Sequence, residues 1–294
     1  MKKLLLFGAA LLGLAASPAS AQTAASPAKM SCCARPAASA SATEAFAMLA
    51  TEKAFSGGHD APLPYSYAGE GRLITFKTAD GQTGSGFEIK SATPSSKYLF
   101  VIHEWWGLND YIKKEAATFA RELPGVNVIA LDLYDGQVAA TSDEAGKLMQ
   151  GVKTERAAAI IKGAQAYAGP KAQFASVGWC FGGGWSLQTA LLGGRQTVGT
   201  VMYYGMPEKD VTKLKQLKSS VLGIFATQDQ WISPAVVAQF QKDMKAAGRP
   251  LTVKSYAADH AFANPSNPKF KQDDAADAHR LTLAYLKKSF KLKA

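Results

Sequence analysis

Residues 176–186 read SVGWCFGGGWS and join two segments of different character around a single cysteine. The run before it, FASVGWC over 174–180, is short and almost wholly apolar, which is typical of a buried β-strand. The segment after it, over 183–192, has the composition and length of a helix. The stretch therefore predicts a strand that turns directly into a helix, with Cys180 at the turn.

Three glycines surround Cys180 at the spacing that a sharp strand-to-helix turn requires. Gly178, Gly182 and Gly183 stand two before, two after and three after the cysteine, where side chains would collide. A thiol presented in this way is a candidate nucleophile, and the helix N-terminus would lower its pKa. A buried structural cysteine is the alternative. A phosphate-binding loop is disfavoured, because the Lys and Ser/Thr of a P-loop are missing.

Outward from this turn, apolar runs alternate with helical stretches over most of the chain. The runs lie at 98–103, 127–133, 174–180, 197–205, 221–227 and 251–257, and the helices near 110–122, 142–168, 183–192, 234–247 and 271–291. A hairpin with its turn at Asp80-Gly81 precedes them. The pattern predicts an α/β fold with a mostly parallel sheet of about eight strands and helices on both faces.

A thiol nucleophile needs a base, and the base needs a group that orients it. The last predicted strand is followed by His260, and the strand at 221–227 is followed by Asp229, so both should lie at the same sheet edge as Cys180. Asp259 adjoins His260, but side chains of adjacent residues diverge, which favours Asp229. The other histidines lie in the N-terminal region, at a strand end and in the last helix: His59, His103 and His279.

The loop HEWWGLN, residues 103–109, follows the strand at 98–103. In such folds this loop supplies one backbone N–H of an oxyanion hole, and the residue after the nucleophile supplies the other. The expected pair is Trp105 and Phe181. Glu104 lies at a strand end beside two tryptophans, where a carboxylate is expected to meet a partner. A solvent-facing loop position is the alternative for Glu104.

Together these residues resemble the dienelactone hydrolase family of α/β-hydrolases. The resemblance runs from about Arg72 to the C-terminal helix and rests on HEWWGLND, LDLY at 131–134, the GWCFGGG turn, and the loops with Asp229 and His260. It implies the α/β-hydrolase fold over 63–294 and a Cys180-His260-Asp229 triad that attacks an ester or lactone through an acyl-thioester.

The resemblance also implies further roles. Glu104 would interact with the resting thiol, which would stay protonated and turned inward until substrate binds, and would then give way to the substrate. Tyr134 and Phe262 would lie near the substrate. Well-known family members hold the substrate carboxylate with two arginines, but this chain has Gly136 and Asn264 at those places. Without that bidentate recognition, dienelactone itself is doubtful, and a neutral or differently shaped ester, thioester or lactone is favoured.

The N-terminus predicts export. Residues 1–21 combine Lys2-Lys3, an apolar run too short to span a bilayer and the small residues Ala19-Ser20-Ala21, as in a Sec signal peptide of a periplasmic or secreted protein. Residues 22–62 are rich in Ala, Ser and Pro, which predicts an arm that buries little surface. One short helix around 44–53 is compatible with this pattern. The arm carries Cys32 and Cys33, which could pair together, join two chains or bind a soft metal.

The chain has a formal net charge of +10, and the signal peptide carries two of its lysines. The basic surplus lacks the interleaved aromatics of a nucleic-acid face, so nucleic-acid binding is not expected. Cleavage of the signal peptide is expected after Ala21, and no stable membrane insertion is expected after it. We expect a small-molecule ester or lactone as the partner and no metal or other cofactor. Two alternatives remain: an exported binding or thiol- and metal-sensing protein on a hydrolase scaffold, and a peptidase or acyltransferase of the same architecture.

Overall fold

The computed structural model describes residues 41–293 of the 294-residue chain. The expected signal peptide and the Cys32-Cys33 pair lie outside the described residues. Contacts divide the chain between Ser39 and Ala40, and the second unit runs from Ala40 to the C-terminus. Within the described part, no helix is both long and apolar enough to cross a membrane.

Eight strands form one sheet in the order β1-β2-β4-β3-β5-β6-β7-β8. β1 pairs antiparallel with β2, and β2 pairs antiparallel with β4, whereas the remaining neighbours are parallel. The predicted mostly parallel sheet is thus confirmed. The strands are β1 (Arg72–Lys77), β2 (Thr83–Ile89), β3 (Lys97–Ile102), β4 (Asn127–Asp132), β5 (Gln173–Trp179), β6 (Thr197–Tyr203), β7 (Val221–Ala226) and β8 (Leu251–Tyr256).

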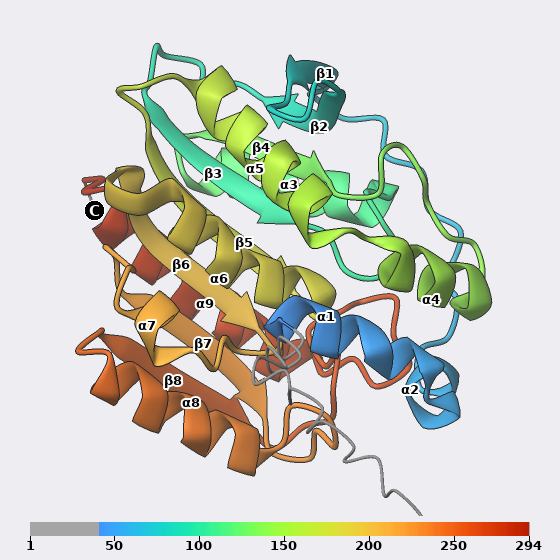
Figure 1. The fold of residues 1–294 in the computed structure, drawn as a ribbon. Helices are drawn as coiled ribbons and strands as arrows, with labels where there is room; N and C mark the ends of the chain where they lie inside the picture. The colour runs from blue at the N-terminus through green and yellow to red at the C-terminus, as the bar shows by residue number, and fades with distance from the viewer. Residues whose placement is uncertain (1–40, 294) are drawn as a thin grey trace, which may run out of the picture. The chain divides into compact units, whose positions relative to one another are not determined.

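Helices lie between the strands at the predicted places, and Figure 1 shows their arrangement around the sheet. The predicted stretch 142–168 is two helices, the single short helix expected around 44–53 is two helices joined by a 3₁₀ turn, and the short helix α7 was not expected. The helices are α1 (Ala42–Ala47), α2 (Lys53–Gly57), α3 (Asp110–Glu122), α4 (Ser142–Gly151), α5 (Thr154–Ala168), α6 (Phe181–Gly193), α7 (Val211–Leu214), α8 (Pro234–Ala246) and α9 (Gln272–Ser289), with a 3₁₀ turn at Met48–Thr51.

The central strand β5 is buried on both faces, and its pleat determines which helix each side chain meets. Ser176 Oγ donates to the carbonyl oxygen of Ser186 in α6. Trp179, three residues on and therefore on the opposite face, packs against Phe119 of α3. Tyr203 of β6 bonds Thr282 of α9, also opposite α6. Helices thus cover both faces, which explains why the run 174–179 is almost wholly apolar.

Residues 41–59 differ from the expectation that the segment 22–62 is an arm with little buried surface. Ser41 and Glu44 form a capping box that starts α1. The side chains of Phe46 and Phe55 are almost fully buried, at 2% and 0% exposure. Two aromatic side chains on a short helical segment bury enough apolar area to hold it against the domain. Because the surrounding residues are mostly Ala and Ser, the sequence did not indicate that these two phenylalanines hold the segment in place.

A glycine substitution tests the tight turn after β5. A Cβ at Gly178 would overlap the backbone carbonyl of Gly182, which has no room to move. Gly178→Ala is expected to lower the free energy of unfolding by about 3 kcal/mol or more, the upper range for overpacking. In Gly151→Ala, the matched control, the Cβ meets nothing, so the change should stay within about 1 kcal/mol. Chemical denaturation measures both, and equal stabilities of the two variants would contradict the turn geometry.

Candidate active site

Cys180 lies at the carboxyl end of β5 as the N-cap of α6. Its backbone has φ 57° and ψ −120°, a left-handed conformation that a non-glycine residue adopts only under strain. The Cys180 N–H donates to the carbonyl of Tyr203 at 3.0 Å, which fixes the turn to β6. The side chain is 1% exposed and carries a free thiol. The strained turn therefore points a buried sulfur toward the carboxyl edge of the sheet.

His260 follows β8 and Asp229 follows β7, and the two side chains meet at that edge. His260 Nδ1 donates to Asp229 Oδ2 at 2.7 Å. The other oxygen, Asp229 Oδ1, accepts backbone N–H groups of Trp231 and Ile232, both at 2.9 Å. Burial alone would raise the pKa of Asp229, but His260 and these two donors outweigh it and lower the pKa. Asp229 is thus a fixed carboxylate that orients the imidazole.

The free nitrogen of His260 faces Cys180. With Nδ1 bonded to Asp229, His260 Nε2 is buried and has no hydrogen-bond partner among the described residues. Ligand atoms of Cys180 and His260 lie within 4.8 Å of each other. Asp259, the alternative orienting acid, instead pairs with Lys269 at 3.6 Å near the surface. The structure therefore brings together Cys180, His260 and Asp229, in the order that proton transfer needs.

The thiol carries a pKa well above its ordinary value, contrary to the expected lowering by the helix N-terminus. Burial is the main cause, and the charge of Glu104 adds to it. The backbone N–H groups of Phe181 and Trp105 lie near the sulfur and act in the opposite direction. Burial wins because desolvation penalises an anion more than two peptide dipoles stabilise it. The thiol is protonated in this closed structure, and the two expected oxyanion donors converge on it.

Glu104 is a buried carboxyl with a single side-chain partner. Asn264 Nδ2 donates to Glu104 Oε2 at 2.7 Å, and Asn264 Oδ1 accepts from the N–H and the hydroxyl of Ser266, both at 2.8 Å. Burial raises the pKa of Glu104 to about 7, although the Asn264 bond lowers it in part. Glu104 therefore lies in the interior, and the alternative of a solvent-facing loop acid is wrong.

His103 positions the loop that carries Glu104 and Trp105. Its Nδ1 donates to the carbonyl of Glu104 at 2.6 Å, while its Nε2 accepts the N–H of Leu133 at 3.1 Å. Both ring nitrogens are thus satisfied by backbone in a neutral imidazole, whose pKa burial lowers. His103 links the ends of β3 and β4 and has no nitrogen left for chemistry.

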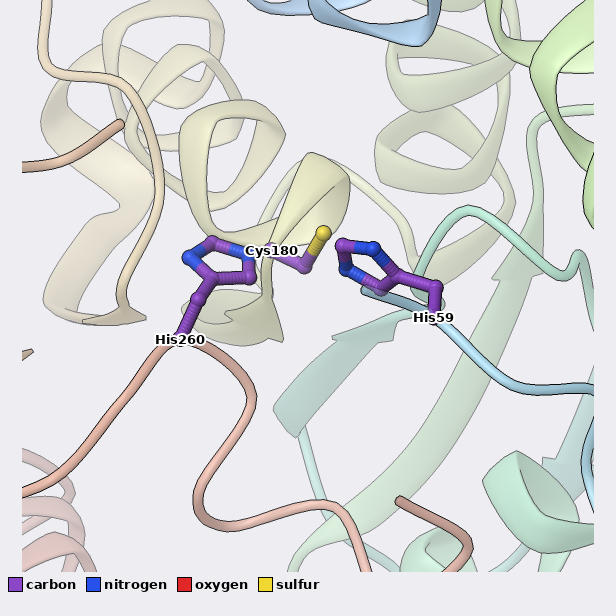
Figure 2. A group of neighbouring side chains, drawn as sticks. All are labelled: His59, Cys180 and His260. Atoms are coloured by element: carbon purple, nitrogen blue, oxygen red, sulfur yellow. The ribbon is translucent and has the colours of Figure 1, made fainter. Parts of the chain in front are cut away.

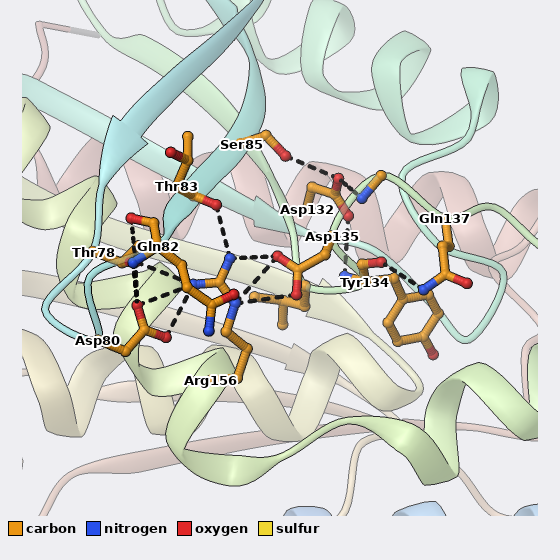
Figure 3. Close-up of polar contacts among 12 residues, drawn as sticks. Thr78, Asp80, Gln82, Thr83, Ser85, Asp132, Tyr134, Asp135, Gln137 and Arg156 are labelled. Atoms are coloured by element: carbon orange, nitrogen blue, oxygen red, sulfur yellow. Dashed lines mark hydrogen bonds and ion pairs between the residues drawn. The ribbon is translucent and has the colours of Figure 1, made fainter.

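Tyr134 projects from a turn after β4 that is held by polar contacts (Figure 3). Asp132 accepts the backbone N–H groups of Tyr134 at 3.0 Å and Gly136 at 2.6 Å. Arg156 of α5 pairs with Asp135 of the same turn at 2.5 Å and with Asp80 at 3.1 Å. The Tyr134 hydroxyl is buried and has no hydrogen-bond partner within residues 41–293, and burial and the nearby Cys180 raise its pKa. This places a free hydroxyl close to the thiol.

Phe262 is fully buried, but its ring packs against Tyr204 and Tyr256, at centroid distances of 5.7 and 5.1 Å. Tyr204 in turn lies 5.0 Å from the His260 ring. Phe262 therefore supports the site from behind, and these contacts do not favour the expected direct contact with substrate.

His59 is the main site residue that the sequence did not reveal. It follows α2, is 4% exposed, and its ring lies 5.5 Å from that of His260 and 4.6 Å from that of Trp105. Figure 2 shows the Cys180 sulfur between the rings of His59 and His260. A capping box followed by Phe46 and Phe55 was the available signal that this segment folds. Nothing in the sequence indicated where it docks.

Comparisons with known proteins agree with this geometry. The sequence profile of the Dienelactone hydrolase family matches residues 86–290. A 235-residue match to Protein usf of Aquifex pyrophilus is 30% identical and covers 74% of this chain and 98% of that protein. Carboxymethylenebutenolidase of Pseudomonas sp. (strain P51) is 26% identical over 74% of this chain and 95% of its own.

Solved structures share the fold. A dienelactone hydrolase-like promiscuous phosphotriesterase from metagenomic libraries superposes with a TM-score of 0.60 at 20% sequence identity, over 75% of this chain and 99% of its own. At that identity the likeness concerns the arrangement of strands and helices. It includes the parallel sheet whose carboxyl edge carries the residues described above.

Proposed function

The chain belongs to the dienelactone hydrolase family, whose members are hydrolases of ester or lactone bonds, and from this premise we propose that it cleaves such bonds through a Cys180-His260-Asp229 triad. The observation that supports this most directly is the 2.7 Å bond from His260 Nδ1 to Asp229, which leaves the unpartnered Nε2 facing the buried thiol. A base aimed at a thiol and oriented by a carboxylate is the arrangement that nucleophilic catalysis requires.

The first half of the reaction forms an acyl-enzyme. His260 Nε2 takes the proton of Cys180 as the sulfur attacks the substrate carbonyl, and the carbonyl oxygen becomes an oxyanion. The N–H groups of Trp105 and Phe181, which lie near the resting sulfur, would stabilise that oxyanion. Collapse expels the alkoxide, which leaves as an alcohol with the proton from His260. The product is an acyl-thioester on Cys180.

The second half hydrolyses the thioester. His260, again neutral, takes a proton from water, whose oxygen attacks the same carbonyl in the same oxyanion site. The thiolate leaves and recovers the proton from His260, so the free acid is released and the resting thiol is restored. No step needs an oxidant, a metal or a second substrate besides water.

Glu104 and burial account for the resting state. Both raise the pKa of Cys180, so the thiol stays protonated until a substrate changes its surroundings. A protonated, enclosed thiol is poorly reactive toward oxidants, since the thiolate is the reactive form. This would protect the nucleophile in an oxidising compartment, consistent with our proposal that residues 1–21 direct export.

The surroundings of the site favour a small substrate without a negative charge. The amide of Asn264 donates to Glu104, and Gly136 has no side chain. Neither residue therefore supplies the two parallel N–H donors with which a guanidinium binds a carboxylate. Phe46 and Phe55 cover His260 at ring distances of 6.3 and 6.0 Å. We therefore propose neutral short-chain esters or lactones, which enter when the segment 41–59 moves.

Turnover of a panel of p-nitrophenyl esters and small lactones tests the function, combined with mass spectrometry of the quenched enzyme. We expect hydrolysis of short-chain esters and an added acyl mass on the peptide that contains Cys180, removable by hydroxylamine. Pre-steady-state kinetics show whether an intermediate accumulates, as an initial burst of p-nitrophenol. If a burst is seen but no acylated Cys180 peptide is found, the thioester route is excluded. Absence of ester and lactone turnover would exclude the proposed activity itself.

A further inference from the structure

His59 is a buried histidine with one nitrogen unaccounted for. Its Nδ1 donates to the carbonyl of Phe55 at 2.6 Å, one turn earlier in the chain. Its Nε2 is buried and has no hydrogen-bond partner among the described residues. A buried polar atom left without a hydrogen bond destabilises the folded state. The bond to Phe55 uses only Nδ1, so neither that bond nor the packing of the ring explains the unpartnered Nε2.

The free nitrogen of His59 belongs to a group of three potential ligand atoms. His59, Cys180 and His260 each offer one ligand atom, all three atoms lie within 4.8 Å of one another, and all three residues are buried. Figure 2 shows the sulfur flanked by the two rings. A tetrahedral Zn²⁺ with Zn–S of about 2.3 Å and Zn–N of about 2.0–2.1 Å separates its ligand atoms by roughly 3.3–3.6 Å. Side-chain shifts of about 1 Å would therefore close the group around an ion.

The hydrogen bonds behind both imidazoles match those of metal-binding histidines. Such histidines donate their second ring N–H to a carboxylate or a backbone carbonyl, which fixes the tautomer and directs the other nitrogen at the metal. His260 does so to Asp229, and His59 does so to Phe55. Both rings are thus held with Nε2 toward the sulfur.

We infer that His59, Cys180 and His260 form a binding site for a divalent ion of the Zn²⁺ type, with the fourth position open to water or another small ligand. Two imidazoles and a thiolate suit this borderline-soft ion. Binding releases the thiol proton to solvent as the Zn–S bond forms. The thiolate and the Asp229 carboxylate together balance the charge of the ion, which meets the need for compensation in a buried site.

The site would regulate the hydrolase. This consequence, unlike the metal binding, rests on the proposed function, because the ion occupies the sulfur that attacks and the nitrogen that takes its proton. The third ligand, His59, comes from the segment 41–59, which we propose must move for substrate to enter. Metal binding would thus block the nucleophile and the base and fix that segment in its closed position.

Cobalt(II) binding tests the site without reference to activity. The full chain with Cys32→Ser and Cys33→Ser, which removes the other thiols, is treated with chelator and reductant and titrated with Co²⁺. We expect a thiolate-to-cobalt charge-transfer band and the visible bands of a four-coordinate ion, both displaced by Zn²⁺. His59→Gln should weaken binding at least about 100-fold, since disturbing only the partner of a ligand costs 10–100-fold. The matched control is His279→Gln, because His279 bonds Glu122 outside the site, and it should bind as the parent does.

Two further measurements distinguish failure of the metal site from failure of the proposed hydrolase activity. Zn²⁺ should raise the thermal unfolding midpoint of the parent but not of His59→Gln, and it should inhibit ester hydrolysis by the parent reversibly on addition of chelator. A parent without the charge-transfer band, or a His59→Gln variant that is folded and binds Co²⁺ like the parent, would overturn the metal site. If His59→Gln does not fold, loss of the band in Cys180→Ser and in His260→Gln decides instead. Metal binding by a chain without ester turnover would reject the proposed function and retain the site.

Discussion

Replacing Cys180 with alanine is expected to lower kcat/KM for an activated ester by at least about 100-fold. The sulfur is the atom that our proposal places on the acyl group, and removing it leaves only the oxyanion donors and the binding surface. His260→Gln should cause a loss of the same order, because general acid–base catalysis contributes about 10²–10⁴-fold. Initial rates with p-nitrophenyl acetate measure both variants.

A pair of neighbouring acids supplies the matched control for this prediction. Asp229→Asn keeps the shape of the side chain but removes the charge that orients His260, and kcat should fall at least about 100-fold. Asp259 is next to His260 in sequence, yet it pairs with Lys269 at 3.6 Å and not with the imidazole. Asp259→Asn should therefore retain activity within about twofold. Equal rates for wild type, Cys180→Ala and His260→Gln would remove the triad from the proposal.

Glu104→Gln is expected to abolish one component of the pH dependence of stability. Burial raises the pKa of Glu104 to about 7 from an ordinary value of 4.5. An acid whose pKa is higher in the folded state binds more protons when folded, so its contribution is complete below pH 4.5 and is lost as the pH rises through 7. That shift corresponds to about 3 kcal/mol. Glutamine is neutral at every pH, so the Glu104→Gln variant does not lose this stability as the pH rises.

Urea unfolding of wild type and Glu104→Gln between pH 4.5 and 8 measures this contribution, as the difference between the free energies of unfolding of the two proteins. The free energy of unfolding of wild type, relative to the variant, should fall by about 3 kcal/mol over that range. Glu155 is exposed, so Glu155→Gln serves as the control and should follow wild type. A wild-type curve parallel to that of Glu104→Gln would show that Glu104 titrates as an ordinary carboxyl.

Sequence patterns were sufficient to predict the order of strands and helices and the residues at the sheet edge. The burial of β5 on both faces requires an unbroken apolar run, and the tight turn at Cys180 requires glycine on both sides, so both features are visible in the residues alone. Because parallel strands end at one edge, positions directly after strands predicted that Glu104, Cys180, Asp229 and His260 would lie together.

The enclosure of the thiol and the docking of the N-terminal segment depend on contacts between residues distant in sequence. The helix N-terminus predicts a low pKa, but the pKa of Cys180 rises because residues distant in sequence enclose it. Residues 41–59 read as an arm, because two phenylalanines among Ala and Ser show no period, yet they place His59 beside Cys180. The burial of a side chain and its distance from other residues depend on the whole folded chain. A local sequence pattern therefore does not predict which distant surface a short helix will cover.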